Sequence, residues 1–460
     1  MLVGCEFNNE DKLVLSHYGK DGKLSIVEKR IREEDVFNWV SSDRQTPNIT
    51  WDKTYIEKSK SRRLSRFRME ELMNTYLNKE TKSAIHEFNK PKVAILDIEV
   101  YVNKNNDFPS AELALFPINL ITVLIDNTAY VLTTLPQMES DQISKMNNEL
   151  NDYISSFGQK INILYQYFPN EKYLLECFCN NLLPKLPFIT GWNVIKYDWL
   201  YIYNRCEKNK VVLTKRLPSQ DLGMGKIPIH TGMIDYIDAM KAFTPIKDLE
   251  NHKLDTVAYR TLGVTKFENP YNSFYEFIQD TYKFTLYNII DTVLIKLIDA
   301  NLNMMGSSFA ICNISELEVS KIFSSVYMTE IFLCREFYKK GIFLPNKKIS
   351  GMKDFKYTGA YVKEPIPGFY ELISCFDFNS MYPNIAVQFN ISPETYLGFF
   401  DKINPANLPE KWTKTIKGTV FDTTYDSTTR ILLTEKYNQR KVIQKQMEEL
   451  EFELETKKNN

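Results

Sequence analysis

The region from Lys92 to about residue 300 alternates strand-like and helix-like segments, and this pattern constrains the fold of the 460-residue chain more than any other feature. An apolar run at 93–96 leads into the sequence DIEV at 97–100, and further strand-like runs follow at 120–125 and 129–132. Helical segments then alternate with strands. Such alternation predicts an α/β layer.

The flanking regions predict further domains, because a domain holds roughly 150 residues and this chain is about three times as long. Residues 1–90 mix short strands with a charged helix at 66–76, residues 314–340 have a helical pattern, and the chain ends in a highly charged helix. The composition is that of a globular protein, with 43% hydrophobic and 25% charged residues. We therefore expect a multidomain fold of the α/β and α+β classes.

Composition also argues against several classes of protein. No run approaches the roughly 20 apolar residues that span a bilayer, and acidic residues stand near the start, where a signal peptide would be basic and then apolar. We therefore expect a cytoplasmic protein without a membrane partner. Seven cysteines without a paired CxxC spacing, and only four histidines, predict neither disulfides nor a zinc site.

A basic cluster is the first local signal for nucleic acid, although the net charge of the chain is only −1. Its six cations are Lys58, Lys60, Arg62, Arg63, Arg66 and Arg68. Along one face they would contact several phosphates. A solvated basic stretch is an equally open interpretation.

Asp97 and Glu99 form the first candidate catalytic pair. Residues i and i+2 of a strand point to the same face, so the two carboxylates project together at the end of an apolar segment, an arrangement that suits a divalent metal. By itself, such a pair also fits two solvated acids at the edge of a strand.

Two later segments supply further candidates. An apolar strand at 188–189 enters a Gly/Asn turn that delivers Asp198, and a helical pattern places Tyr287 beside Asp291, four residues later. A helix cap at Asp198 and a surface Tyr/Asp pair are the alternatives. Two divalent metals roughly 4 Å apart that clamp an attack on phosphate need three or four converging carboxylates and a group that orients water. The two segments and the DIEV strand together meet this requirement.

In order and spacing these residues resemble the three exonuclease motifs of family B DNA polymerases, and the sequences GWNVIKYDWLYIYNR and YNIID are similar to the T4-like branch. The resemblance implies an N-terminal domain at 1–90 and an RNase H-like 3′–5′ exonuclease domain at 91–305. It implies that Tyr287 positions the attacking water or the scissile phosphate, and that the metal is Mg²⁺, with Mn²⁺ as the alternative. The implied metal ligands are Asp97, Glu99, Asp198 and Asp291. The stretch at 219–229 looks shorter than the β-hairpin of T4-like enzymes, which implies less efficient strand transfer.

The sequence ELISCFDFNSMYPNI at 371–385 predicts a strand that ends at Asp377, a tight turn, and a helix with Pro383 in its first turn. Exposed N–H groups at such a turn suit a triphosphate. The segment resembles the polymerase palm motif DxxSLYPS, with Met and Asn in place of Leu and the last Ser. By this resemblance Asp377 binds the catalytic metals and Tyr382 lies under the deoxyribose. The backbone expected to face the triphosphate is that of Phe378, Asn379, Ser380 and Met381.

Two further segments resemble polymerase elements. Tyr357, Gly359 and Ala360 match the YxGG/A element that contacts template DNA, and Arg440 lies in a segment similar to the first fingers helix, where its planar fork would bind phosphate. The resemblance therefore implies a helical connection at 306–350 that packs on the N-terminal domain, a partial palm at 351–435 and the first fingers helix at 436–460.

Other polymerase elements have no counterpart in this sequence: the second palm carboxylate, the second fingers helix and the thumb. An apolar stripe of coiled-coil spacing runs along the last helix and predicts either a partner helix or packing on its own domain. The stripe consists of Ile443, Met447, Leu450 and Leu454.

We therefore expect the N-terminal subunit of a split DNA polymerase of a phage-like genome, which binds a DNA primer–template and dNTPs in the host cytoplasm. Its protein partners would be a second polypeptide with the rest of the palm, the fingers and the thumb, and a sliding clamp. A stand-alone 3′–5′ DNA exonuclease with a relic palm and a non-catalytic nucleic-acid-binding regulator are the alternatives.

Overall fold

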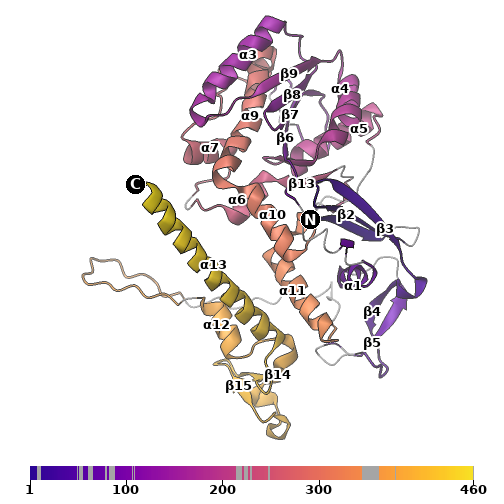
Figure 1. Ribbon diagram of the computed structural model, residues 1–460, viewed down its shortest axis with the longest axis vertical. Helices are drawn as coiled ribbons and strands as arrows, with labels where there is room; N and C mark the ends of the chain where they lie inside the picture. Colours follow the sequence, from indigo (N-terminus) through magenta and orange to yellow (C-terminus); the bar gives the residue numbers. More distant parts are fainter. Residues whose placement is uncertain are drawn as a thin grey trace. The chain divides into compact units, whose positions relative to one another are not determined.

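The computed structural model describes residues 1–7, 12–48, 50, 55–60, 66–77, 80–81, 89–105, 107, 109–213, 220–221, 226–227, 231–246, 249–343, 362–378 and 380–458 (Figure 1). The chain forms two compact units. The first comprises Met1–Val36 and Arg62–Met328, and the second comprises Phe37–Ser61 and Thr329–Asn460. No helix in these described ranges is both long and apolar enough to cross a membrane.

A six-stranded mixed sheet lies at the centre of the first unit. Its strands are β6 (Ala94–Val100), β7 (Ile118–Ile125), β8 (Thr128–Thr133), β9 (Asn162–Tyr167), β10 (Phe188–Gly191) and β13 (Gly232–Asp235). Their order across the sheet is β13-β10-β6-β7-β8-β9. Strand β7 is antiparallel to β6 and β8, whereas β10 is parallel to β6 and β13, and β9 is parallel to β8.

Helices cover both faces of this sheet (Figure 1). The helices of this part of the unit are α3 (Ser140–Tyr153), α4 (Glu171–Cys177), α5 (Leu200–Asn209), α6 (Tyr236–Phe243), α7 (Leu254–Leu262), α8 (Phe274–Gln279), α9 (Thr281–Leu302) and α10 (Met304–Ser315). Helix α9 packs on β6 and β7 and contacts α3 and α7, while α4 and α5 lie on the opposite side of the sheet. The predicted α/β layer is confirmed.

The alternation along β6 determines which side chains face which layer. Leu96 and Ile98 belong to one buried core with Leu174 of α4 and Ile202 of α5. Because successive side chains of a strand point to opposite faces, the intervening Asp97 is directed to the other face, which α9 covers. The burial pattern of β6 thus directs its acidic residues toward α9.

The N-terminal part of the first unit is a small antiparallel sheet with one helix. Strands β1 (Leu2–Phe7), β2 (Lys12–Tyr18) and β3 (Leu24–Arg30) pair in sequence order. Helix α1 (Arg66–Tyr76) lies where the sequence predicts it, and its Leu72 shares a core with Leu13 and Leu15 of β2. The Tyr18 hydroxyl accepts a hydrogen bond from Gly232 N–H (3.2 Å), which ties this sheet to β13.

The second unit contains short sheets and two described helices beyond α11. Its elements are β4 (Phe37–Ser41), β5 (Ile56–Lys60), most of α11 (Ser325–Lys339), α12 (Met381–Gln388), β14 (Tyr396–Phe399), β15 (Trp412–Lys414), β16 (Thr419–Asp422) and α13 (Thr428–Lys458). β4 pairs with β5, the other strands form a sheet of order β14-β16-β15, and α12 packs on α13. The predicted charged terminal helix is confirmed as α13.

Two local predictions were wrong. The helical pattern at 314–340 is interrupted, because Glu316 takes a left-handed backbone (φ 56°) that ends α10, and α11 begins only at Ser325. The strand expected to end at Asp377 is absent: residues 362–378 form neither helix nor strand, and Leu372 and Phe376 are exposed. A strand persists only where a neighbouring strand pairs with its backbone groups, and no described residue pairs with this segment.

Candidate active site

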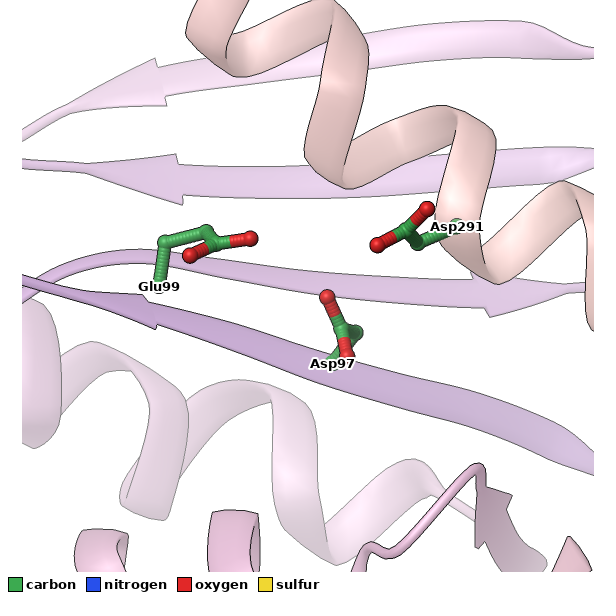
Figure 2. Close-up of side chains that lie close together, drawn as sticks. All are labelled: Asp97, Glu99 and Asp291. Carbon is green, nitrogen blue, oxygen red and sulfur yellow. The ribbon is translucent and has the colours of Figure 1, made fainter. Parts of the chain in front are cut away.

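Three acidic side chains from β6 and α9 converge in the first unit. Asp97 and Glu99 project from β6, and Asp291 projects from α9 toward them (Figure 2). One carboxylate oxygen from each lies within 4.8 Å of the others. The predicted i, i+2 pair and the acid predicted on the helix therefore meet in one cluster.

Asp198 lies beside this cluster but is not one of the three residues within 4.8 Å. It is carried by a π-helical turn, η5 (Ile195–Trp199), and is 5% exposed. Its Oδ1 accepts a hydrogen bond from the N–H of Ile98 (3.0 Å), the residue between Asp97 and Glu99. The structure thus holds the fourth predicted carboxylate against the backbone of the strand that bears the first two.

The close approach of β10 and β6 depends on Gly191. A Cβ atom at this position would lie 2.4 Å from the carbonyl oxygen of Leu96, the residue before Asp97. Only glycine allows the two strands to run so close at this point. The predicted Gly/Asn turn therefore brings the Asp198 segment next to the acidic end of β6.

Lys266 is a cation in the site that our sequence analysis missed. Its ammonium group forms an ion pair with Asp291 and lies 4.2 Å from the centroid of the Tyr287 ring. The Lys266 N–H donates to Asp255 of α7 (2.8 Å), which anchors the loop after that helix. No motif or periodicity distinguishes this lysine from others in the chain, so sequence reasoning had no signal for it.

Asn288 is a second residue that the sequence analysis missed. It is fully buried on α9, and its Nδ2 donates a hydrogen bond to Asp97 Oδ2 (2.5 Å). Its position inside the YNIID motif was an available signal. The neighbouring Tyr287 packs edge-on against Phe274 and Phe277, so the aromatic cluster orients its ring at the site.

Burial raises the pKa of every carboxyl in the site. Burial and the neighbouring Asp291 raise the pKa of Glu99 to about 8, and burial raises the pKa of Asp198 to about 7. For Asp291, burial outweighs the opposing effect of Lys266, and the pKa is about 6. Burial and the surrounding carboxylates also raise the pKa of Asp97 well above its usual range. The site therefore binds either protons or cations strongly.

The donor set fits a divalent metal ion. It consists of carboxylate oxygens, which Mg²⁺ and Mn²⁺ prefer. Asp291 Oδ1 is buried and has no hydrogen-bond partner among the described residues. A buried acceptor without a donor is costly unless a cation or water satisfies it.

The described residues of the predicted polymerase motif belong to the second unit and are exposed or partly exposed. Asp377 and Phe378 are exposed in the irregular segment, and α12 begins at Met381 after Ser380, whose backbone is left-handed (φ 52°). Tyr382 in its first turn is 76% exposed.

Other predicted contacts divide between described and undescribed parts of the chain. Arg440 is exposed on α13. Asn379, Tyr357, Gly359 and Ala360 lie outside the described residues. The region predicted to hold a shortened hairpin contains two paired strands of two residues each, β11 (Gln220–Asp221) and β12 (Lys226–Ile227). The effect of that hairpin on strand transfer stays a prediction.

The basic cluster at 58–68 is not one continuous exposed surface. Arg68 is 7% exposed and forms an ion pair with Glu71, so it is unavailable to phosphate. Lys58 and Lys60 are exposed on β5. Arg62, Arg63 and the side chain of Arg66 lie outside the described residues.

The family models and the curated relatives that match this chain belong to DNA polymerases. Residues 28–257 match the model of the DNA polymerase family B exonuclease domain, and residues 322–458 match that of DNA polymerase family B. The DNA-directed DNA polymerase of Escherichia phage RB69 is 29% identical over 413 residues, which cover 82% of this chain and 44% of that protein. That of Enterobacteria phage T4 is 28% identical over 342 residues, 68% of this chain and 37% of that protein.

A more distant relative is DNA polymerase 1 of Sulfolobus acidocaldarius, 26% identical over 320 residues, which cover 65% of this chain and 34% of that protein. The chain thus spans less than half the length of these curated relatives. The two family matches lie in the order expected from the sequence, with the exonuclease region first. This chain belongs to family B of the DNA polymerases and contains the exonuclease domain and part of the polymerase region of that family.

Proposed function

We propose that this chain is a metal-dependent 3′–5′ proofreading exonuclease that also carries half of a DNA polymerase active site. The observation that supports the exonuclease most directly is the buried cluster of Asp97, Glu99 and Asp291 between β6 and α9. The expected domain division at 1–90, 91–305, 306–350, 351–435 and 436–460 is part of this proposal.

In the proposed exonuclease, the three clustered carboxylates and Asp198 hold divalent cations, Mg²⁺ or alternatively Mn²⁺. Bound cations of this kind neutralise charge on the scissile phosphate and lower the pKa of the attacking water. Asn288 fixes the orientation of Asp97 through its hydrogen bond. Lys266 offsets part of the negative charge of the cluster through Asp291.

Tyr287 acts as a hydrogen-bond donor in this proposal. Burial, together with the nearby Asp291 and Glu99, raises the pKa of its phenol, so the hydroxyl stays protonated at neutral pH. A protonated phenol can donate to the attacking water or to a phosphate oxygen.

The polymerase half-site rests on the motif at 377–382 and on Arg440. Asp377 would bind catalytic metals, the backbone of Phe378, Asn379, Ser380 and Met381 would face the triphosphate, and Tyr382 would contact the sugar. The left-handed Ser380 and the start of α12 at Met381 support this role, because a helix start directs N–H groups outward to an anion. Tyr357, Gly359 and Ala360 would contact the template of a DNA primer–template, and dNTPs would be the substrates.

A second polypeptide is the proposed source of the remaining palm, fingers and thumb. The apolar stripe on α13 supports this, since Ile443, Met447, Leu450 and Leu454 are 53–59% exposed. A regular apolar stripe of this spacing is stable in water when another helix covers it. A sliding clamp is proposed as a further partner, and the host cytoplasm as the compartment, because two of the relatives are phage polymerases.

The deciding experiment is degradation and extension of a 5′-labelled primer, single-stranded and annealed to template, with and without Mg²⁺. We expect the chain alone to shorten the primer with Mg²⁺, and Asp97→Asn with Asp291→Asn to abolish shortening. Synthesis is expected only after addition of the second polypeptide, and loss of synthesis in Asp377→Ala.

The alternatives give different results in the same assay. Degradation without synthesis in the presence of the correct partner would indicate a stand-alone exonuclease with a relic palm. DNA binding without any Mg²⁺-dependent shortening would refute the proposed exonuclease and indicate a nucleic-acid-binding regulator.

A further inference from the structure

The end of β13 lies directly beside the turn that carries Asp198. β13 pairs in parallel with β10, and Asp235 at its end is in register with Gly191 at the end of β10. The Asp235 carboxyl is 2% exposed. Burial of an acid near other acids is unfavourable unless hydrogen bonds compensate for it. The hydrogen bonds of Asp235 therefore indicate its role in the structure.

The first of these bonds is to η5. Asp235 Oδ1 accepts from the N–H of Ile195 (2.7 Å), the first residue of the turn that bears Asp198. The N–H groups of a first helical turn lack acceptors within the helix, so this carboxylate serves as its cap. Lys196, the next residue, lies 3.8 Å from Asp235 and 3.0 Å from Asp238.

The loop before η5 is held by the same element. Ile237 N–H donates to the carbonyl oxygen of Trp192 (3.1 Å). The Trp192 ring stacks on Tyr236, with centroids 5.8 Å apart and an angle of 27°. Both ends of the connection from β10 to η5 are therefore attached to the junction of β13 and α6.

From η5 the contact continues to β6. β10 pairs with β6 only at Ala94 and Ile95, so it does not reach Ile98. The N–H of Ile98 is satisfied by the Asp198 carboxylate instead. Two side-chain-to-backbone hydrogen bonds thus connect β13 to η5 and η5 to β6.

We propose that Asp235 is a positioning residue for Asp198: by capping η5 at Ile195 it sets the place of the Asp198 carboxylate against β6. This inference rests on the proposed exonuclease function and extends it to a residue outside the carboxylate cluster. Asp235 acts through Ile195 and Asp198, and it is not one of the three clustered acids. Its hydrogen-bond acceptor, rather than its charge, performs this role.

Two variants distinguish the role of the hydrogen-bond acceptor from that of the charge. Asp235→Ala removes both, whereas Asp235→Asn removes the charge and keeps the Oδ1 acceptor. We expect Asp235→Ala to lower kcat for degradation of single-stranded DNA by about 10- to 100-fold, as for other residues that orient metal ligands, with KM changed less than about twofold. Asp235→Asn should keep kcat within about threefold of the parent.

Two measurements test the inference without activity. Mn²⁺ affinity, followed by electron paramagnetic resonance, should fall by about tenfold in Asp235→Ala and stay near the parent value in Asp235→Asn. Amide hydrogen exchange at Ile98 and Ile195 should accelerate in Asp235→Ala only. These readouts stay valid if the parent chain does not hydrolyse DNA, so failure of the proposed function and failure of this inference are distinguishable.

Glu171→Ala is the matched control. Glu171 is a buried acid that accepts from the N–H of Ile118 (2.7 Å) and pairs with Arg205, away from the carboxylate cluster. At a temperature where all variants are folded, Glu171→Ala should leave Mn²⁺ affinity unchanged. The inference is overturned if Asp235→Ala lowers only thermal stability, or if Asp235→Asn is as defective as Asp235→Ala.

Discussion

Lys266 forms an ion pair with Asp291 at the acidic cluster, and the same ammonium group lies 4.2 Å above the ring of Tyr287. Burial by itself would lower the pKa of Lys266, but Asp291, Asp97 and Glu99 raise it, so the lysine stays charged. A permanent cation therefore stabilises the ionised form of the acids that are proposed to bind metal.

Removal of this cation should shift the pH dependence of hydrolysis. In Lys266→Met the carboxyl pKa values should rise, because an opposite charge in contact shifts a pKa by about one unit or more. We expect the rising limb of the kcat/KM profile to move upward by about one pH unit. Lys283→Met, at a partly exposed lysine on α9 that pairs with Asp280, is the control and should not move the limb. An unshifted profile in Lys266→Met would contradict the assignment.

The stability of the metal-free protein should fall as pH rises from about 5 to 8. A carboxyl whose pKa is higher in the folded protein binds its proton more tightly when folded, so its contribution to stability is present at low pH and is lost as pH rises through the folded pKa. These folded pKa values are about 6 for Asp291, about 7 for Asp198 and about 8 for Glu99.

Metal should reverse this loss, because cations bind the ionised carboxylates and stabilise the folded state by mass action. Differential scanning calorimetry should therefore give a larger increase in Tm on addition of Mg²⁺ at pH 8 than at pH 6. Equal increases at the two pH values would indicate that Mg²⁺ does not bind these acids.

Asp97→Asn should raise the stability of the metal-free protein and lower its exonuclease activity. The substitution removes one of the mutually repelling buried charges and keeps the shape of the side chain, so we expect the metal-free Tm at pH 8 to rise by a few degrees. Primer shortening should fall by at least about 100-fold, since a metal ligand is lost. A lower Tm combined with retained hydrolysis would show that Asp97 is a structural residue.

The stripe on α13 should mediate association with the second polypeptide. Met447→Glu and Leu450→Glu place charges on side chains that are 53% and 59% exposed, so the helix itself should stay folded while the apolar contact is lost. Co-purification of the two chains and synthesis should disappear, whereas primer shortening by this chain should persist. Glu448→Gln, beside the stripe, is the control. If both charged variants still associate with the second polypeptide, the stripe is not the interface.

The local sequence predicted the elements that carry the site, because each depends on neighbouring residues. Strand β6 with its i, i+2 acids, the helix that pairs Tyr287 with Asp291, and the charged helix α1 all lie where the local sequence pattern predicts them. The prediction of a strand before Asp377 was wrong because a strand depends on a partner elsewhere in the chain. An apolar pattern specifies a strand only when another strand pairs with it.

Contacts between distant segments were decided by the tertiary structure. The hydrogen bond from Asn288 to Asp97 joins residues 191 positions apart, and that from Ile195 to Asp235 joins residues 40 positions apart. The sequence by itself determined which carboxylates the site contains and on which elements they lie. Only the folded chain decided that Lys266, Asn288 and Asp235 support them, because a single hydrogen bond or ion pair between distant residues leaves no periodic pattern along the chain.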